Sequence, residues 1–495
     1  MSSGMFDRLQ PRFDAGRLAG RATTMQASLG LAAVALVNVV VAVTVSRSGS
    51  QAFVLVLGAI AVVPIVWVAV ERPDWILYTA LLVIMLGGVP TMFNPSATPR
   101  LLGGPGGTGG TNVSAEDLFV LLAIGSAVLR LLIRRRGDER PRFGTIVLSW
   151  PLVLLATALM QGVIRGHDHY GTSYISQPVR IFAYAAIGLA FVETPPDRLL
   201  RNLTRVFYLT IAVSTLQAGY YLATGTSQTD TSALSTGGTR VLALSTAMYL
   251  AAGLVLALVH LDLNPQSERR RLHIWMAILA ALGIVVSLGR TTFAAVAILV
   301  PVLVVVLRRL RRTMLTYFPV AVAVAMLVAV FVIIVSPSTA STIGHRFTGN
   351  VGTDTAVIQR QRKYKATMQG FDQNPIFGFG FGRPVTFVSI DQTVQTFSGD
   401  PENSYIYVLA GGGIVALASL LTLVGLFFID CGRRFLRSER APRAVVTLGA
   451  SLAFILLVNA ASGPVLSNPP LMLLTWIGLL LPAVATRQRT DARSS

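Results

Sequence analysis

The sequence is poor in two kinds of residue on which soluble proteins depend, charged residues and cysteine. Only 13% of its 495 residues are charged, whereas a soluble domain usually has about a quarter. The lone cysteine, Cys431, excludes a disulfide framework and a cysteine-based metal site within this chain. Hydrophobic residues make up 53% of the chain and gather in long runs, so the sequence predicts a polytopic membrane protein.

Lysine is nearly absent as well, since all but two of the 41 basic residues are arginine. The formal net charge of +19 would suit a nucleic-acid-binding protein, but the arginines lie in short clusters between apolar runs, where they orient helices in a bilayer. No nucleic-acid partner is therefore expected. A cleavable signal peptide is not expected either, because the basic N-terminal segment leads into an apolar run that is too long for one.

About fourteen apolar segments approach the ~20 residues that a helix needs to cross a bilayer. They lie at about 28–45, 52–70, 75–92, 115–133, 144–163, 177–194, 204–224, 241–261, 272–287, 291–307, 314–336, 403–429, 444–463 and 470–486. The predicted fold class is an all-α polytopic membrane protein with about 14 transmembrane helices (12 to 14). Residues 1–495 are predicted to form a single transmembrane domain.

The basic residues divide unequally between the two sets of segments that connect these spans. The set that includes both termini holds 29 of the 41, and the other set holds 12. By the positive-inside rule, both termini are predicted to be cytoplasmic. This threading makes residues 337–402 one long extracytoplasmic loop and places Arg290 at the tip of a short outer turn.

A basic helix is predicted within the long outer loop. Asp354 can cap a helix that runs to about Gly370, and Asn374-Pro375 and a glycine-rich turn follow it. Because the positive-inside rule disfavours outer basic residues, the cluster either lies beside anionic headgroups or binds a phosphate or pyrophosphate. The cluster consists of Arg360, Arg362, Lys363 and Lys365.

Three more arginines, Arg180, Arg240 and Arg290, lie at outer ends of predicted spans. Each either extends toward the headgroups or adds a bidentate contact to the same anion. Glu402 lies where the long loop re-enters the membrane. Its carboxylate either caps the helix that begins near Asn403 or acts as a general base for a hydroxyl nucleophile.

Other polar motifs predict no cofactor and no metal. The glycine-rich segment 93–114 lacks the Lys-Ser/Thr ending of a phosphate-binding loop. His167, Asp168 and His169 have no third and fourth ligand within range. Asp117, at the start of a span, is interpreted as a cap or packing residue.

Three segments in the same order resemble the O-antigen ligase and polymerase superfamily, the Wzy and WaaL type of bacterial envelope enzymes. They are the turn SLGR ending at Arg290, the segment RQRKYKATMQGFDQNPIFGFGFGRP, and the re-entry segment PENSYIYVLAGGGIVAL. The resemblance covers about residues 270–430, which is taken as the O-antigen ligase-like core region.

The resemblance implies a metal-independent, inverting glycosyltransferase of the GT-C type in the bacterial cytoplasmic (inner) membrane. Its implied donor is a polyprenyl-pyrophosphate-linked glycan, its acceptor a glycan or lipid, and its role cell-surface polysaccharide biosynthesis. Membrane lipids are further partners. Arg290 matches the family's turn arginine, and either Arg360 or Arg362 matches its loop arginine. The resemblance implies that the turn arginine and the loop arginine together hold the pyrophosphate.

The re-entry motif carries the remaining correspondences. Asn403 and Tyr405 match the family motif, and Lys365 joins the predicted binding residues. Ligases of the family place histidine where this chain has Glu402 and tryptophan where it has Tyr364, which favours a polymerase-like or diverged member. Glu402 and Arg290 are the predicted catalytic residues.

Two other classes of protein compete with this interpretation. A transporter or flippase of lipid-linked sugars would show charged or broken helices at the midplane and a repeat between halves, whereas the polar residues here gather at the outer boundary. A scaffolding membrane protein would not require cations on the outer side.

Overall fold

The structure is a computed structural model that describes four main stretches, within residues 195–224, 242–263, 268–330 and 355–494, with gaps. Short pieces within 78–85, 100–102, 113–114 and 150–157 are also described. The chain's contacts divide it into Met1–Ile76 and Leu77–Ser495, and every described residue belongs to the second unit. Four predicted spans, 28–45, 52–70, 115–133 and 177–194, lie outside the described residues.

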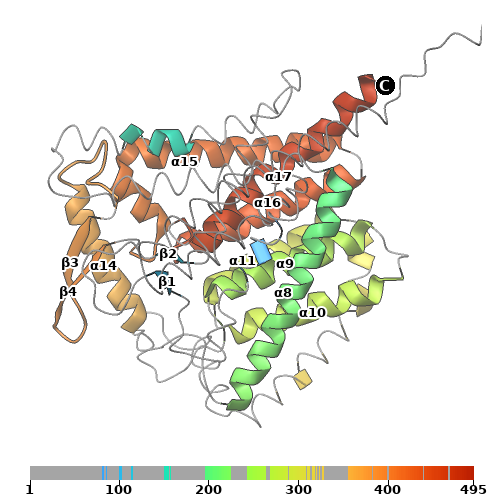
Figure 1. Cartoon of the computed structure of the whole chain (residues 1–495), viewed down its shortest axis with the longest axis horizontal. Helices are drawn as coiled ribbons and strands as arrows, with labels where there is room; N and C mark the ends of the chain where they lie inside the picture. The colour runs from blue at the N-terminus through green and yellow to red at the C-terminus, as the bar shows by residue number, and fades with distance from the viewer. Residues whose placement is uncertain are drawn as a thin grey trace, which may run out of the picture. The chain divides into compact units, whose positions relative to one another are not determined.

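Seven long helices coincide with predicted spans. They are α8 (Pro196–Thr224), α9 (Leu244–Leu263), α10 (Arg270–Val286), α11 (Arg290–Val306), α15 (Ser404–Arg437), α16 (Arg440–Ala460) and α17 (Pro469–Ser494) (Figure 1). α8 begins earlier than the predicted residue 204. The reason is local, because Pro196 suits the first helical position and Asp197 is favourable in the first turn.

Several of these helices suit a bilayer. Within the part of the chain that the structure describes, three are long and apolar enough to cross a membrane, Ser245–Leu263, Ser404–Arg437 and Ala441–Ala460. A fourth candidate consists of α11 and the helix Arg309–Tyr317, which is bent from it by 110°. The protein is therefore a helical membrane protein as predicted, while the count of about fourteen spans stays a prediction.

Side-chain contacts show that the helix ends form two groups. Thr204 of α8 bonds His260 near the end of α9 at 2.6 Å, and Tyr208 bonds His273 near the start of α10 at 2.5 Å. In a separate group, Thr292 at the start of α11 donates to Asn459 Oδ1 near the end of α16 at 2.7 Å. These contacts place the end of α9 and the start of α10 beside α8, and the start of α11 beside the end of α16.

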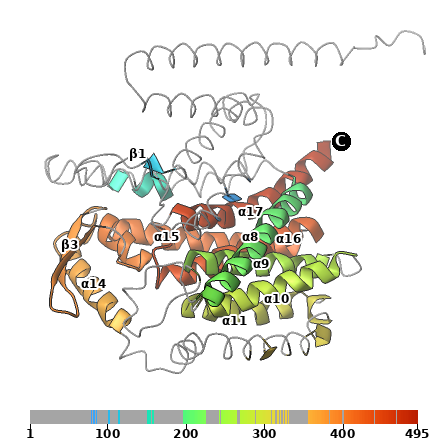
Figure 2. The same cartoon turned by 60° about the horizontal axis from the view of Figure 1, so that its bottom comes forward.

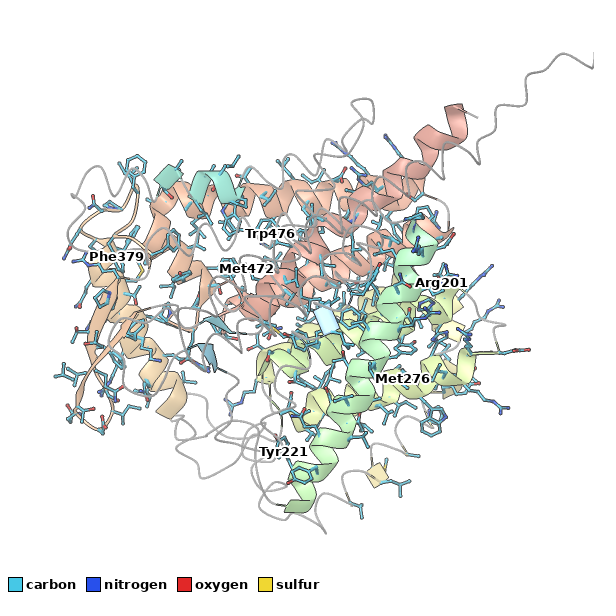
Figure 3. The ribbon with its side chains drawn as sticks, in the orientation of Figure 1. Arg201, Tyr221, Met276, Phe379, Met472 and Trp476 are labelled. Carbon is cyan, nitrogen blue, oxygen red and sulfur yellow. The ribbon has the colours of Figure 1, made fainter. Side chains whose placement is uncertain are left out.

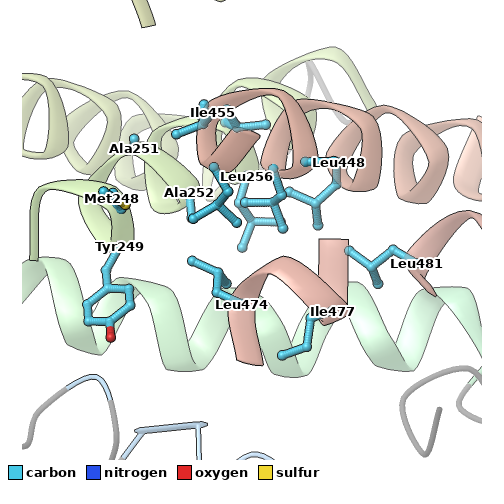
Figure 4. Packing of buried hydrophobic residues seen from close by; sticks show 14 of the residues in the cluster. Met248, Tyr249, Ala251, Ala252, Leu256, Leu448, Ile455, Leu474, Ile477 and Leu481 are labelled. Atoms are coloured by element: carbon cyan, nitrogen blue, oxygen red, sulfur yellow. The ribbon is translucent and has the colours of Figure 1, made fainter. Parts of the chain in front are cut away.

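The core lies where α16 packs against α9 and α17. Buried alanines and leucines interdigitate there, as Figure 4 shows for Ala252 and Leu256 of α9 with Leu448 of α16 and Leu474 of α17. α16 and α17 approach closely at Gly449, where an added Cβ would lie 2.8 Å from a backbone oxygen of α17. Small residues allow this kind of contact between membrane helices.

α15 is broken at Gly413, whose φ of 71° and ψ of −171° are not helical. The segment that follows α14 fills the break. Ile414 N donates to Pro375 O at 2.9 Å, and Phe379 N (Phe379 is labelled in Figure 3) donates to Ala410 O at 2.7 Å. Buried backbone groups need such partners, so the hydrophilic loop completes the hydrogen bonding of a membrane helix.

Two glycines allow the loop to approach. Gly378 and Gly413 have φ of 73° and 71°, in the left-handed region that favours glycine. A Cβ on Gly413 would lie 2.0 Å from Ile376 O, and one on Gly378 would lie 2.4 Å from Ala410 O. Neither position tolerates a side chain.

The long loop carries α14 (Thr355–Phe371) and a hairpin of β3 (Pro384–Val388) and β4 (Val394–Ser398). α14 contacts β3, and Figure 2 shows the helix beside the hairpin. A second hairpin joins β1 (Arg100–Leu102) and β2 (Val113–Ser114). The predicted basic helix is therefore confirmed, whereas the all-α prediction missed both hairpins.

Candidate functional site

Glu402 lies between two cations of α14. Arg360 Nε donates to its Oε2 at 2.6 Å, and Lys363 Nζ donates to its Oε1 at 3.0 Å. Arg360 and Lys363 are three residues apart and so share one face of the helix. The three side chains are 27%, 20% and 35% exposed for Arg360, Lys363 and Glu402, so the cluster is half-buried and open to solvent.

The backbone of Glu402 has an unusual conformation. Its φ is 69°, a left-handed value that is uncommon outside glycine and costs on the order of 1–3 kcal/mol. The ion pairs hold its side chain, and Tyr364 Oη donates to its carbonyl oxygen at 3.2 Å. A strained residue that its surroundings support in this way is typical of functional sites.

The cations determine the charge of this carboxyl group. Burial by itself would raise the pKa of Glu402, but the charges and hydrogen bonds of Arg360 and Lys363 together outweigh it, and the net pKa is lower than usual. Glu402 is therefore ionised at neutral pH. The ion pairs stabilise the fold above the usual carboxyl pKa, and this stabilisation is lost as the pH falls through the lowered value.

Asn403, not Glu402, caps α15, so the cap interpretation of Glu402 is wrong. Asn403 Oδ1 accepts from the backbone N–H groups of Tyr405 and Ile406, each at 3.1 Å. Its Nδ2 donates to Ala461 O, just beyond α16, at 2.9 Å. Asn403 thus joins the start of α15 to the end of α16.

Two neighbours of Asn403 strengthen this joint. Tyr405 Oη donates to Leu457 O at 2.8 Å, and Ser404 Oγ donates to Gly463 O at 3.1 Å. These contacts give Tyr405 a structural partner in α16. They fix the first residues of α15, directly after the capping residue, and so hold the preceding Glu402 at the open end of the helix pair.

Arg362 faces away from Glu402, toward the hairpin. Its Nη1 donates to Val388 O at 3.2 Å and to Ser389 O at 2.6 Å. Lys363 Nζ lies 6.0 Å and 5.7 Å from the ring centroids of Phe387 and Phe397, which is within the range of cation–π attraction. The hairpin therefore supports α14, and of the two candidate loop arginines only Arg360 is bonded to Glu402.

Arg290 is the first residue of α11, as the predicted short turn requires. The next two residues attach this start to the end of α16, since Thr291 bonds Ser462 through their hydroxyls and Thr292 bonds Asn459. The end of α16 thus contacts the starts of both α11 and α15. Arg290, the first residue of α11, and Glu402, which directly precedes the cap of α15, therefore lie at the same end of these helices.

The remaining predicted residues divide into two groups. Arg180, Arg240, Asp117 and the His167–His169 motif lie outside the described residues. Lys365 is exposed on α14, and among the described residues there is no group of three histidines, cysteines or acids that could hold a metal. Asp372 and Asp391, two other loop acids, are exposed.

Sequence reasoning missed the partners that position the site. Tyr364 was noted only as a departure from the family pattern, and Asn459 and Ser462 were not singled out. A polar residue near the end of an apolar helix was the available signal for Asn459, because such groups need a partner in a bilayer. Nothing in the sequence indicated that the partner would be Thr292.

Part of the chain is similar to a known protein family. Residues 275–421 match a family model described as O-antigen ligase. The matched segment includes Arg290, α14 and Glu402, and it confirms the resemblance to the O-antigen ligase and polymerase superfamily. It supports a glycosyltransferase-like enzyme with a ligase- or polymerase-like role in polysaccharide biosynthesis at a bacterial inner membrane. No curated protein matches the chain.

Proposed function

We propose that the protein is a membrane glycosyltransferase that polymerises or ligates polyprenyl-pyrophosphate-linked oligosaccharides at the outer face of the cytoplasmic membrane. The observation that carries the proposal is the Glu402 carboxylate held by Arg360 and Lys363 within the O-antigen ligase match. A carboxylate and cations side by side provide the two groups that transfer from a pyrophosphate donor needs, a base and an anion-binding surface.

In the resting site the Glu402 carboxylate occupies the cations Arg360 and Lys363. An incoming donor competes with it for the same cations. A pyrophosphate carries more charge than a carboxylate and accepts bidentate contacts from arginine. When the donor binds, its phosphates take over the bonds of Arg360 and Lys363. Glu402 is then released next to the donor, so the base becomes available only when a donor is present.

The proposed transfer follows an inverting course. The acceptor hydroxyl loses its proton to Glu402, and its oxygen forms a bond to the anomeric carbon of the donor sugar. The bond from that carbon to the pyrophosphate oxygen breaks, and the polyprenyl pyrophosphate leaves with the electron pair. Arg290 and Arg360 stabilise the charge on the leaving group.

Substitution of Arg360 by lysine tests whether this residue holds the donor. We expect the KM for the lipid-linked donor to rise about tenfold, because lysine keeps the charge but loses the bidentate fork. Arg362→Lys is the matched control, since Arg362 is two residues away on α14 but bonds the hairpin carbonyls. Equal effects of the two changes on the KM would contradict the assignment.

Thiol labelling tests the proposed orientation. With Cys431 replaced by alanine, single cysteines at Ser341 and Ser398 should react with a membrane-impermeant reagent in intact cells. A cysteine at Ser438, at the opposite end of α15, should react only after lysis. The reverse labelling pattern would place the Glu402 site on the cytoplasmic side and would exclude an outer-face transferase.

A further inference from the structure

A ligand-sized cavity lies at the ends of the helices away from Glu402. Its volume is about 470 Å³, within the usual range of ligand pockets. It is bounded by the last turns of α9, α11 and α15 and the first turns of α16. The lining residues are Val259, Asp262, Leu263, Val306, Leu307, Arg309, Phe435, Arg443, Ala444 and Thr447.

The polar side of this cavity has two guanidinium groups and one carboxylate. The carboxylate of Asp262 is already bonded within the cavity wall. Its Oδ1 accepts from the backbone N–H groups of Arg309 and Leu310 at 3.1 Å and 3.2 Å. Its charge is thereby directed at the start of the helix that carries Arg309. The cavity keeps an excess of positive charge, which selects an anion.

Arg443 is held in place by its neighbours. Its Nη2 donates to Ser438 O at 3.0 Å, and its guanidinium lies 5.2 Å from the centroid of the Phe435 ring. Stacking of this kind restricts the side chain and leaves further N–H groups of the fork for a ligand. An arginine fixed in this way is suited to bidentate contact with a phosphate.

The opposite side of the cavity is apolar and buried. Val259 is 2% exposed, and Leu307 and Ala444 are each 6% exposed, whereas Arg309 and Arg443 are exposed. The cations therefore lie at the mouth and the apolar wall lies inside. Because the cavity is at the end of apolar helices, this order matches the order of head and chain in a lipid leaflet.

We infer that this cavity is a binding site for a phosphate-bearing amphiphile, a membrane phospholipid whose phosphate contacts Arg309 and Arg443. One acyl chain lies along the wall formed by Val259, Leu307 and Ala444. The site is separate from the Glu402 cluster, and the inference does not depend on the proposed transferase reaction. A soluble phosphate has the same headgroup chemistry but leaves the apolar wall uncovered.

Native mass spectrometry of the purified full chain with added phosphatidylglycerol tests the inference. We expect the double variant Arg309→Gln, Arg443→Gln to bind the lipid at least tenfold more weakly than the unsubstituted protein. Ala444→Phe, which fills the cavity and keeps both arginines, should also lose the lipid. Arg433→Gln is the matched control, because Arg433 is exposed near the end of α15 and does not line the cavity.

The outcomes separate the possible ligands. Lipid loss in the double variant and in Ala444→Phe, with retention in the control and unchanged thermal unfolding, supports the site. Equal lipid retention in all four proteins would overturn it. Displacement of the lipid by inorganic phosphate at the same concentration would also overturn it and would identify a soluble phosphate as the ligand.

Discussion

Glu402→Gln is expected to lower glycan transfer by about 10² to 10⁴-fold, the usual contribution of a general base. The amide cannot accept the proton of the acceptor hydroxyl. The fold should persist, because the half-exposed ion pairs with Arg360 and Lys363 contribute at most about 1 kcal/mol and Asn403 still caps α15. The measurement is transfer from a lipid-linked donor by protein in nanodiscs, together with thermal unfolding.

The controls distinguish a base from a structural anion. Glu268→Gln removes an exposed acid near the start of α10 and should leave the rate unchanged. Glu402→His should recover part of the lost rate, because an imidazole can take the same proton. Full activity of Glu402→Gln would show that Glu402 is not the general base, even if Arg360 still binds the donor.

Arg290→Lys should lower the turnover number on the order of 10²-fold, which is typical when one donor to developing negative charge is lost. Lysine keeps the positive charge, but the two parallel N–H groups that match a pyrophosphate are lost. Expression and folding should be normal, because the contacts that attach the start of α11 to α16 come from Thr291 and Thr292.

A matched change checks that the effect belongs to the site. The control is Arg309→Lys. Arg309 lies near the other end of α11 and lines the separate cavity, so this change should leave the turnover number unchanged. A lysine variant at Arg290 with near-normal turnover would show that charge alone suffices there. The role of Arg290 in stabilising the leaving group would then be wrong.

Hydropathy and helix signals were sufficient to predict most of the described helices. The apolar runs predicted α9, α10, α11 and α16 within a few residues, because a bilayer requires such runs. The start signal at Asp354 and the stop signal at Asn374-Pro375 predicted the bounds of α14, Thr355–Phe371, within a few residues, because such signals act locally in the chain. The basic helix was also predicted, and two of its cations pair with Glu402, while the roles of these residues stay predictions.

What the sequence did not reveal depends on contacts between distant segments. The pairing of Lys363 with Glu402 spans 39 residues, and no local pattern predicts which cation meets which acid. The break at Gly413 is matched by the backbone of Pro375 and Ile376, nearly 40 residues earlier in the chain. The β3–β4 hairpin was missed because its strands are short, and this kind of alternation is a weak signal in a long polar loop.

The length of the broken helix α15 limits how far Glu402 can lie from the hydrocarbon layer of the bilayer. Beyond Gly413, residues 414–437 make about 36 Å of helix, enough to cross the ~30 Å hydrocarbon layer. Residues 404–412 add at most about 14 Å, so Glu402 lies within about two headgroup layers of the Gly413 end of that segment. For the proposed lipid-linked donor, this depth would bring the pyrophosphate to the acid while the polyprenyl chain stays in the hydrocarbon.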